Sequence, residues 1–132
     1  SGCSVFSTNE KWLKSKKMMD LLSKKEINGE ELKELLHLRK NNKLQFLLVD
    51  VREEYEYNVS RINGVDFLIP LSELYDKVKE IENQKELPIV MQCKLGGRSQ
   101  QAQRQLEIMG FKNVINLAGG ITEYTGDIIY GN

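Results

Sequence analysis

The fold is decided by the stretch Leu87-Pro88-Ile89-Val90-Met91-Gln92-Cys93-Lys94-Leu95-Gly96-Gly97-Arg98-Ser99. Its first half is a short apolar run that starts after a proline, which is typical of a buried strand. The two glycines mark a turn, and a helical pattern begins near Arg98 and continues through Ala102 and Leu106. A strand that runs through a tight turn into a helix is the building unit of α/β proteins.

The turn has the composition of an anion-binding loop around a reactive cysteine. Cys93 lies at the N-terminal end of the predicted helix, where unpaired N–H groups and the helix dipole lower a thiol pKa. Glycines at 96 and 97 let consecutive amides turn inward, and the basic residues at 94 and 98 add positive charge. The sequence therefore predicts a nucleophilic Cys93, with a substrate-binding loop made of Lys94, Leu95, Gly96, Gly97 and Arg98. The alternative is a small buried thiol before an ordinary glycine turn.

A second apolar run, residues 44–51, precedes this unit in the chain. It is too continuous for a strand with one wet face and predicts a central parallel strand that is covered on both sides. Asp50 and Arg52 come at its carboxyl end, where open α/β sheets place their sites. The two side chains either shape the pocket or lock the end of the strand by pairing with each other.

The remaining elements alternate between strands and helices. We expect strands at 26–27, 67–69 and 114–117. We also expect three helices: one that begins after the N-cap Asn28, one from 71 to about 82, and one that begins near Arg98 and ends at Gly110. Such alternation predicts a mostly parallel sheet with helices on both faces and right-handed crossovers.

Composition limits the function. The net charge is zero, which argues against a nucleic-acid partner, and no apolar run reaches the length of a membrane span. Cys3, Cys93 and His37 are too widely separated for metal-ligand spacing, so we expect no metal, and we expect His37 to have a structural role. A Cys3–Cys93 disulfide would disable the loop, which favours free thiols in a reducing, cytoplasmic compartment.

Residues 1–25 differ in charge from the rest of the chain. Six lysines stand there against one glutamate and one aspartate. We expect this basic extension to be helical and residues 26–132 to form the domain proper. The extension either packs on the domain as an appendage or offers a basic surface to a partner or a membrane.

The motifs together resemble the rhodanese-like domains. The matching pieces, in family order, are Leu48 to Glu54 with Tyr57, Arg61 to Gly64, Ile69 to Leu71, Cys93 to Arg98, Gly110-Phe111 and Asn116 to Ile121. The resemblance implies a three-layer α/β/α fold around a five-stranded parallel sheet. It also implies that Cys93 carries sulfane sulfur as a persulfide, with Asp50, Arg52 and Arg61 as supporting candidates and no cofactor.

Three features are similar to one subgroup in particular. They are Arg61, the Cys-Lys-Leu-Gly loop and the Gly-Gly-Ile-Thr sequence at 119–122. They resemble the rhodanese domains fused behind ubiquitin-activating-like adenylyltransferases, including the molybdopterin-synthase sulfurylases. This resemblance implies a ubiquitin-like sulfur carrier as acceptor, and a chain that is one domain of a longer protein.

The resemblance implies a two-step sulfur transfer. The Cys93 thiolate attacks the outer sulfur of thiosulfate or of a donor persulfide, and an acceptor nucleophile then removes it. Two other functions are open. A cysteine phosphatase places five residues between cysteine and arginine, whereas Cys93 and Arg98 enclose four, a loop too small for phosphate. A non-catalytic binding module would not need the cysteine that stands in this loop.

Overall fold

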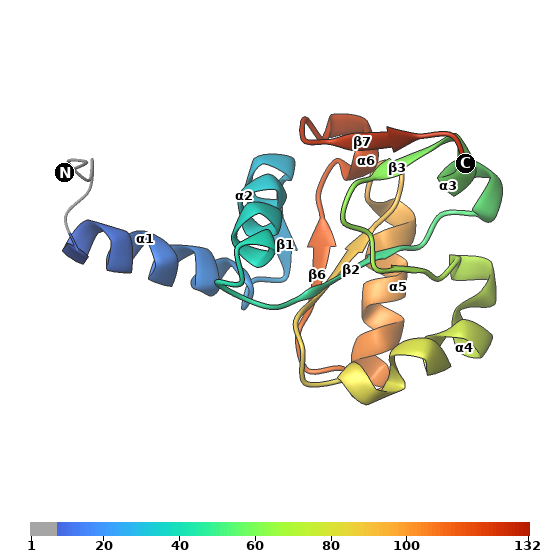
Figure 1. The fold of residues 1–132 in the computed structure, drawn as a ribbon. Helices are drawn as coiled ribbons and strands as arrows, with labels where there is room; N and C mark the ends of the chain where they lie inside the picture. The colour runs from blue at the N-terminus through green and yellow to red at the C-terminus, as the bar shows by residue number, and fades with distance from the viewer. Residues whose placement is uncertain (1–7) are drawn as a thin grey trace.

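Five parallel strands form the central sheet of the computed structural model, which describes residues 8–132 (Figure 1). The strands are β1 (Glu26–Ile27), β2 (Leu47–Asp50), β4 (Phe67–Leu68), β5 (Ile89–Gln92) and β6 (Val114–Leu117). Their order across the sheet is β1-β6-β5-β2-β4, and every neighbouring pair is parallel. The predicted five-stranded parallel sheet is confirmed, and the strand that leads to Cys93 is its central one.

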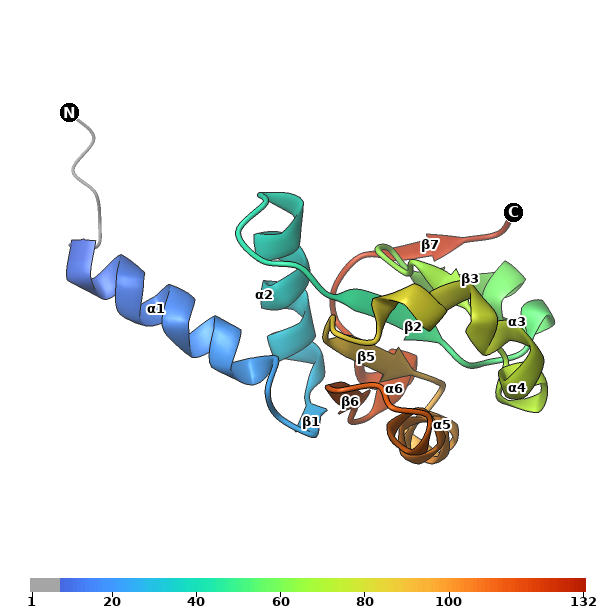
Figure 2. The same ribbon diagram turned by 90° about the horizontal axis from the view of Figure 1, so that it is seen from below.

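Helices cover both faces of the sheet (Figure 2). The α-helices are α1 (Thr8–Leu21), α2 (Gly29–Lys40), α3 (Glu54–Val59), α4 (Leu74–Lys77), α5 (Gly97–Ile108) and α6 (Gly120–Glu123). Two 3₁₀ segments, η1 (Leu71–Glu73) and η2 (Val78–Gln84), flank α4. Helix α2 packs on one face, while α4, η2 and α5 pack on the other, which confirms the three-layer α/β/α class.

Alternate residues of the central strands enter two separate hydrophobic cores. In β2, Leu48 packs on the α2 side and Val49 on the α5 side, and in β5 Val90 and Met91 divide in the same way. All four side chains are fully buried. Because both faces are covered, neither strand shows the polar alternation of a half-wet sheet. Cys93 comes two residues after Met91, so its side chain lies on the same α5 side of the sheet.

The start of α2 shows why its boundary was predictable. The Asn28 side chain accepts the N–H of Glu31 at 2.9 Å, and the Glu31 side chain accepts the N–H of Asn28 at 2.9 Å. This reciprocal capping box satisfies two N–H groups that the helix itself leaves unpaired. The predicted N-cap is confirmed.

Two parts of the fold differ from the sequence-based expectations. The single helix expected from 71 to 82 is divided into η1, α4 and η2, and its 3₁₀ turns keep a spacing close to three residues, so Leu74 and Ile81 still reach the core. Helix α3 and a second, antiparallel sheet of β3 (Ser60–Ile62) and β7 (Ile128–Tyr130) were not predicted. Pairing of such short, distant segments leaves no local pattern in the sequence.

Helix α1 extends away from the sheet and meets the domain at its C-terminal end (Figures 1 and 2). Leu21 and Leu22 are buried there, whereas Trp12 and Leu13 are exposed. The helix expected in the basic extension is therefore present over Thr8–Leu21, while the division of the chain at residue 26 stays a prediction. None of the helices in residues 8–132 has the length and apolar character to cross a membrane.

Candidate active site: the Cys93 loop

The loop after β5 wraps its backbone around the sulfur of Cys93. Gly96 has a φ of 118°, a conformation that side chains other than glycine rarely adopt. This turn directs the N–H of Gly96 to Cys93 Sγ at 3.0 Å, and α5 begins at the next residue. The sequence-based prediction placed a cysteine before a helix N-terminus, and the structure has that arrangement.

The thiol itself is buried, with Cys93 only 1% exposed. Burial acts to raise the pKa of the Cys93 thiol, but the net direction is downward. The opposing cause is hydrogen bonding to the sulfur by the Ser99 hydroxyl, at 3.3 Å, and by the N–H groups of Ser99, Gly96 and Leu95. The loop therefore favours a thiolate without a histidine beside it, as His37 is exposed on α2 and contacts Asn41.

Helix α6 holds the other side of the loop. The N–H of Ile121 donates to the Cys93 carbonyl at 2.9 Å, and the N–H of Thr122 donates to the Lys94 carbonyl at 3.1 Å. Gly120 makes this approach possible, because a Cβ there would lie 2.4 Å from both carbonyl oxygens. The glycine pair at 119–120 is therefore a part of the site, although the sequence analysis named it only within the family resemblance.

Arg98 pairs with Glu56 on α3. Its two terminal nitrogens donate to the two carboxylate oxygens of Glu56 at 2.6 and 2.9 Å. Hydrogen bonding to Arg98 is the main cause that lowers the pKa of Glu56 to about 2, and the same contact raises the pKa of Arg98. Arg98 thus ties the loop to α3, and Glu56 is a residue that the sequence analysis missed.

Asp50 and Arg52 form a buried ion pair at the end of β2. Arg52 Nη2 lies 2.8 Å from Asp50 Oδ2, and the same nitrogen donates to the Ser60 carbonyl at 2.7 Å. Asp50 is fully buried and Arg52 is 4% exposed. These contacts join the end of β2 to β3, and Arg52 also lines the cleft described below, so each of the two roles left open for this pair has a contact that fits it.

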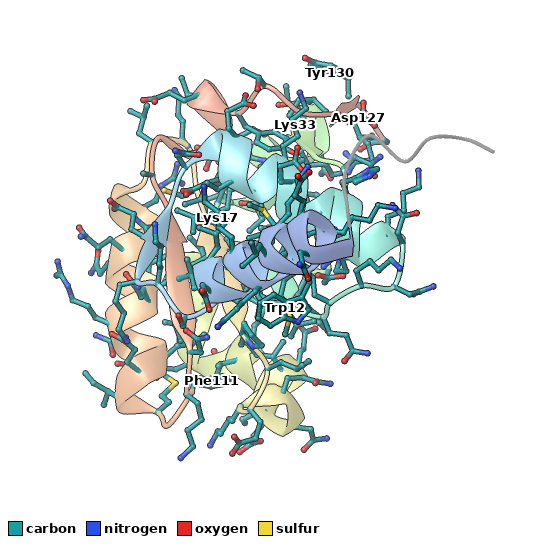
Figure 3. All side chains as sticks on the ribbon, turned by 90° about the vertical axis from the view of Figure 1, so that its left-hand side faces the viewer. Trp12, Lys17, Lys33, Phe111, Asp127 and Tyr130 are labelled. Carbon is teal, nitrogen blue, oxygen red and sulfur yellow. The ribbon has the colours of Figure 1, made fainter. Side chains whose placement is uncertain are left out.

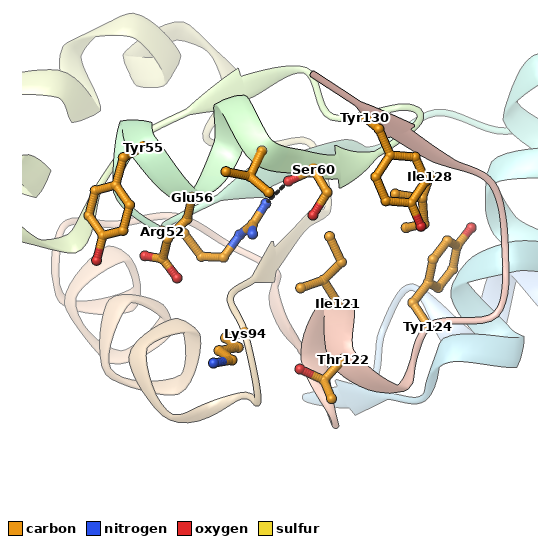
Figure 4. Close-up of a pocket in the computed structure, with 11 residues that line it drawn as sticks. Arg52, Tyr55, Glu56, Ser60, Lys94, Ile121, Thr122, Tyr124, Ile128 and Tyr130 are labelled. Carbon is orange, nitrogen blue, oxygen red and sulfur yellow. Dashed lines mark hydrogen bonds between the residues drawn. The ribbon is translucent and has the colours of Figure 1, made fainter. Parts of the chain in front are cut away.

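A cleft of about 510 Å³ opens beside the loop (Figure 4). Its lining comes from the β2 end, α3, the β3–β7 sheet, α6 and the loop, and consists of Arg52, Tyr55, Glu56, Val59, Ser60, Lys94, Ile121, Thr122, Tyr124, Ile128 and Tyr130. Tyr55 and Tyr130 are strongly exposed aromatic side chains at this cleft. Lys94 is the lining residue that directly follows Cys93, and no contact within residues 8–132 neutralises it.

The remaining predicted residues have different places. Arg61 is not among the cleft residues, since its side chain donates to the carbonyls of Tyr57 and Gly131 and lies over the Tyr57 ring. It joins α3 to the C-terminal segment. Leu95 is 61% exposed beside the site, and Gly97 opens α5. Within residues 8–132 no cluster of three histidine, cysteine, aspartate or glutamate residues could hold a metal ion.

Residues 30–127 match the family model of the rhodanese-like domain. The chain belongs to the rhodanese-like family. Within this rhodanese-like chain the match spans every strand of the central sheet except β1, and it includes the whole Cys93 loop.

Curated relatives carry this domain within longer proteins. The chain is 39% identical over 79 residues to a protein of Bacillus subtilis named as a candidate sulfur carrier, YrkF, and covers 41% of it. It is 37% identical over 99 residues to a tRNA uridine(34) hydroxylase of Protochlamydia amoebophila, of which it covers 30%. These stretches make up 60% and 71% of this chain. This chain spans less than half of the length of either relative.

Solved structures share the fold. A rhodanese-related protein from Thermoplasma volcanium is 28% identical with a TM-score of 0.63, over 80% of this chain and 98% of that one. A rhodanese from E. coli, described with bound anions, is 26% identical with a TM-score of 0.58, over 66% of this chain and all of that one.

Proposed function

We propose that this rhodanese-like domain is a sulfurtransferase that carries sulfane sulfur as a Cys93 persulfide. The observation that carries the proposal is the buried Cys93 sulfur, which accepts hydrogen bonds from the loop and from Ser99 and has a lowered pKa. A thiolate is the nucleophile that sulfur transfer requires. The name of the sulfur-carrier relative supports the same chemistry.

The proposed first step transfers one sulfur from the donor. The thiolate of Cys93 attacks the outer sulfur of thiosulfate. The bond between the two sulfur atoms of thiosulfate breaks, and sulfite leaves with the electron pair of that bond. The product is a Cys93 persulfide anion with its charge on the outer sulfur, and in this proposal the loop N–H groups close to Cys93 Sγ also stabilise that charge. A protein persulfide as donor reacts in the same way and leaves as a thiolate.

In the proposed second step an acceptor nucleophile attacks the outer sulfur and the Cys93 thiolate leaves. Cyanide in this step gives thiocyanate, and neither step consumes a proton or needs a general base. Lys94, the unneutralised cation at the cleft, meets the anionic donor or acceptor. In this proposal Leu95, Gly96 and Gly97 supply the backbone of the cradle, Arg98 anchors it to α3, and Asp50, Arg52 and Arg61 hold the surrounding elements.

The acceptor that we propose is a protein. The cleft beside Lys94 carries exposed aromatic side chains, Tyr55 and Tyr130, of the kind that protein interfaces use. A ubiquitin-like sulfur carrier, implied by the subgroup resemblance, fits this proposal, as does fusion to an adenylyltransferase. A cytoplasmic location, where thiols stay reduced, belongs to the same proposal.

Intact-mass spectrometry after incubation with thiosulfate or a polysulfide tests the proposal. We expect the wild type to gain the mass of one sulfur atom and to lose it on addition of cyanide. Cys93→Ser should gain nothing, and Cys3→Ser, which removes the other cysteine, should load like the wild type. Loading that depends on Cys3, or no loading from any donor, would contradict the proposal.

The wild type and Cys93→Ser also distinguish two other functions, a binding module and a phosphatase. If Cys93→Ser binds a partner as well as the wild type and neither takes up sulfur, the domain is a binding module. Hydrolysis of an aryl phosphate that Cys93→Ser abolishes would identify a phosphatase. The names of the tRNA hydroxylase relatives favour a further candidate, oxidation of a tRNA uridine. That activity would be a property of the longer proteins, because this chain covers less than a third of them.

A further inference from the structure

A line of polar side chains leads from the Cys93 sulfur to the edge of the sheet. Ser99 Oγ lies 3.3 Å from Cys93 Sγ and 2.5 Å from Asn116 Oδ1, and Asn116 Nδ2 lies 3.5 Å from Glu26 Oε2. Cys93, Ser99 and Asn116 are at most 4% exposed, whereas Glu26 is exposed. The line therefore joins a buried sulfur to a carboxylate in water.

The fold explains why these side chains meet. Asn116 on β6 is the register partner of Met91 on β5, so it faces the same side of the sheet as Cys93, two residues further along. Helix α5 packs on that side and places Ser99 above both residues. An asparagine in the middle of the apolar run of β6 is otherwise costly, because a buried polar group must find partners.

Ser99 has more acceptors than it can serve. A hydroxyl donates one hydrogen bond, yet three acceptors lie within reach of Ser99 Oγ, namely Cys93 Sγ, the Gly96 carbonyl at 3.1 Å and Asn116 Oδ1. The contact with Asn116 is the shortest of the three. With the amide in this orientation, Asn116 competes with the sulfur for the one proton.

The amide of Asn116 can also remove this competition. Its two ends differ only in being acceptor or donor, so a half-turn would present Nδ2 to Ser99 Oγ in place of Oδ1. Ser99 would then accept from Asn116 and donate to Cys93. The reversed Oδ1 would face Glu26, whose exposed side chain can move into water.

We propose that Asn116 is a positioning residue for Cys93, which acts by deciding whether Ser99 gives its proton to the sulfur. The anionic Cys93 Sγ of the thiolate draws the Ser99 proton and favours the reversed amide. A neutral thiol leaves the proton with Asn116. The inference rests on the proposed role of Cys93 as a sulfur carrier, and it names the buried polar group that adjusts the carrier to each charge state.

The test is the pH dependence of Cys93 alkylation by iodoacetamide, which reports the thiolate directly, in a Cys3→Ser background. Asn116→Asp has the same shape but only acceptor atoms and a negative charge, so it should slow alkylation at neutral pH by about tenfold, and by less in the Ser99→Ala background, where only the charge acts. Asn116→Ala removes the competing acceptor and should raise the rate. Ser99→Ala should slow the reaction, and Ser99→Thr, which keeps the hydroxyl, should restore it.

The decisive comparison repeats Asn116→Ala in the Ser99→Ala background. Because Asn116 is inferred to act through Ser99, the substitution should then have no effect on the alkylation midpoint. An equal effect in both backgrounds would overturn the inference, as would equal midpoints for Asn116→Asp and Asn116→Ala. Urea unfolding verifies that each variant is folded before it is alkylated.

Glu26→Gln provides a variant that does not disturb the core. Its new amide can donate to the reversed Oδ1 of Asn116, so it should lower the alkylation midpoint more with Ser99 present than with Ser99→Ala. The other charged groups near the line are unchanged in all variants: Arg98 paired with Glu56, Lys94 in the loop, and Glu123 beside Gly119. Equal shifts in both backgrounds would show a simple charge effect and contradict the inference.

Sulfur loading separates this inference from the proposed function. Alkylation needs only the thiolate, whereas loading needs transfer from a donor. If the alkylation cycle shows coupling through Ser99 but the wild type takes up no sulfur, the positioning role stands and the sulfurtransferase proposal fails. If sulfur is loaded on the wild type and the alkylation cycle shows no coupling through Ser99, the sulfurtransferase proposal stands and the positioning role of Asn116 fails.

Discussion

The Cys93 loop and helix α1 differ in how much of the chain holds each of them in place. The Cys93 carbonyl accepts hydrogen bonds from the Gln92 side chain at 2.8 Å and from the N–H of Ile121 at 2.9 Å. The loop is thus held by its own strand and by α6, and Arg98 adds α3. Helix α1 packs on the domain through Met18 and Leu21 in its C-terminal part, followed by Leu22, while Trp12 is 61% exposed (Figure 3).

The contacts of the loop set the geometry around the Cys93 sulfur, whereas the contacts of α1 attach a helix to the domain. Each contact to the loop fixes a backbone group close to the sulfur, so a small displacement changes the hydrogen bonds that set the thiol pKa. The described apolar packing of α1 comes from the side chains of Met18 and Leu21, with Leu22 directly after the helix. Substitutions in the two regions should therefore differ greatly in effect, and the following three predictions span that range.

Gly120→Ala should have the largest effect, since it places a methyl group where the loop now lies. The new Cβ would be 2.4 Å from the carbonyl oxygens of Cys93 and Lys94, and Gly120 has a φ of 56°. We expect a loss of about 2 to 4 kcal/mol in the free energy of unfolding. We also expect sulfur loading to fall by more than about tenfold, because the loop must shift from α6. Urea unfolding and intact-mass spectrometry measure the two effects.

Gly97→Ala is the matched control in the same loop. No heavy atom lies within 4 Å of the position that its Cβ would occupy, and its φ is not positive. Because alanine has a higher helix propensity than glycine, the variant should be as stable as the wild type or slightly more stable. If both variants lost loading equally, close approach of α6 would not be the cause.

Glu56→Gln should have an intermediate effect, because it removes the charge that pairs with Arg98. The pair is partly buried, but Arg98 keeps 36% of its side-chain surface in water, which screens the attraction. We expect the variant to lose about 1 to 2 kcal/mol of stability at pH 7. Glu54→Gln, an exposed position on the same helix, should change stability by less than about 0.5 kcal/mol.

The pH dependence of this loss has a defined sign. The pKa of Glu56 is lowered in the folded protein to about 2 from its ordinary value of 4.5. A lowered pKa means that the pair contributes fully above pH 4.5 and is lost as the pH falls toward 2. The difference between wild type and Glu56→Gln should therefore shrink over that interval in urea unfolding experiments. A constant difference from pH 7 to pH 3 would contradict the assignment to Glu56.

The sequence predicted the parts of the site that are close together in the chain. Cys93, its glycine turn and the following helix form one continuous unit, and the apolar runs before residues 50 and 93 mark covered strands. Arg98 was predicted as a positively charged residue of the loop, but its partner on α3 was not predicted. Glu56 lies 42 residues earlier on a six-residue helix, and nothing local in the sequence relates the two.

Ser99 and Asn116 show a second limit of local patterns. Ser99 stands in the stretch that decides the fold, yet its contact with the sulfur depends on where the first turn of α5 places it. Asn116 is a polar residue within an apolar strand, and that mismatch is a signal that points to a buried partner. The β3–β7 sheet, which supplies part of the cleft wall, pairs residues about 70 positions apart and leaves no such signal.

Trp12→Ala on α1 should have the smallest effect, although tryptophan is the largest side chain in the protein. Its side chain is mostly in water, and the described contact is Lys16 Nζ, 5.3 Å from the ring centre. We expect a change of less than about 0.5 kcal/mol in urea unfolding and no change in sulfur loading. Leu21→Ala, on the same helix but 5% exposed, should cost about 2 to 3 kcal/mol. Equal losses in the two variants would show that the outer part of α1 is held as firmly as its end, and the contrast with the Cys93 loop would then fail.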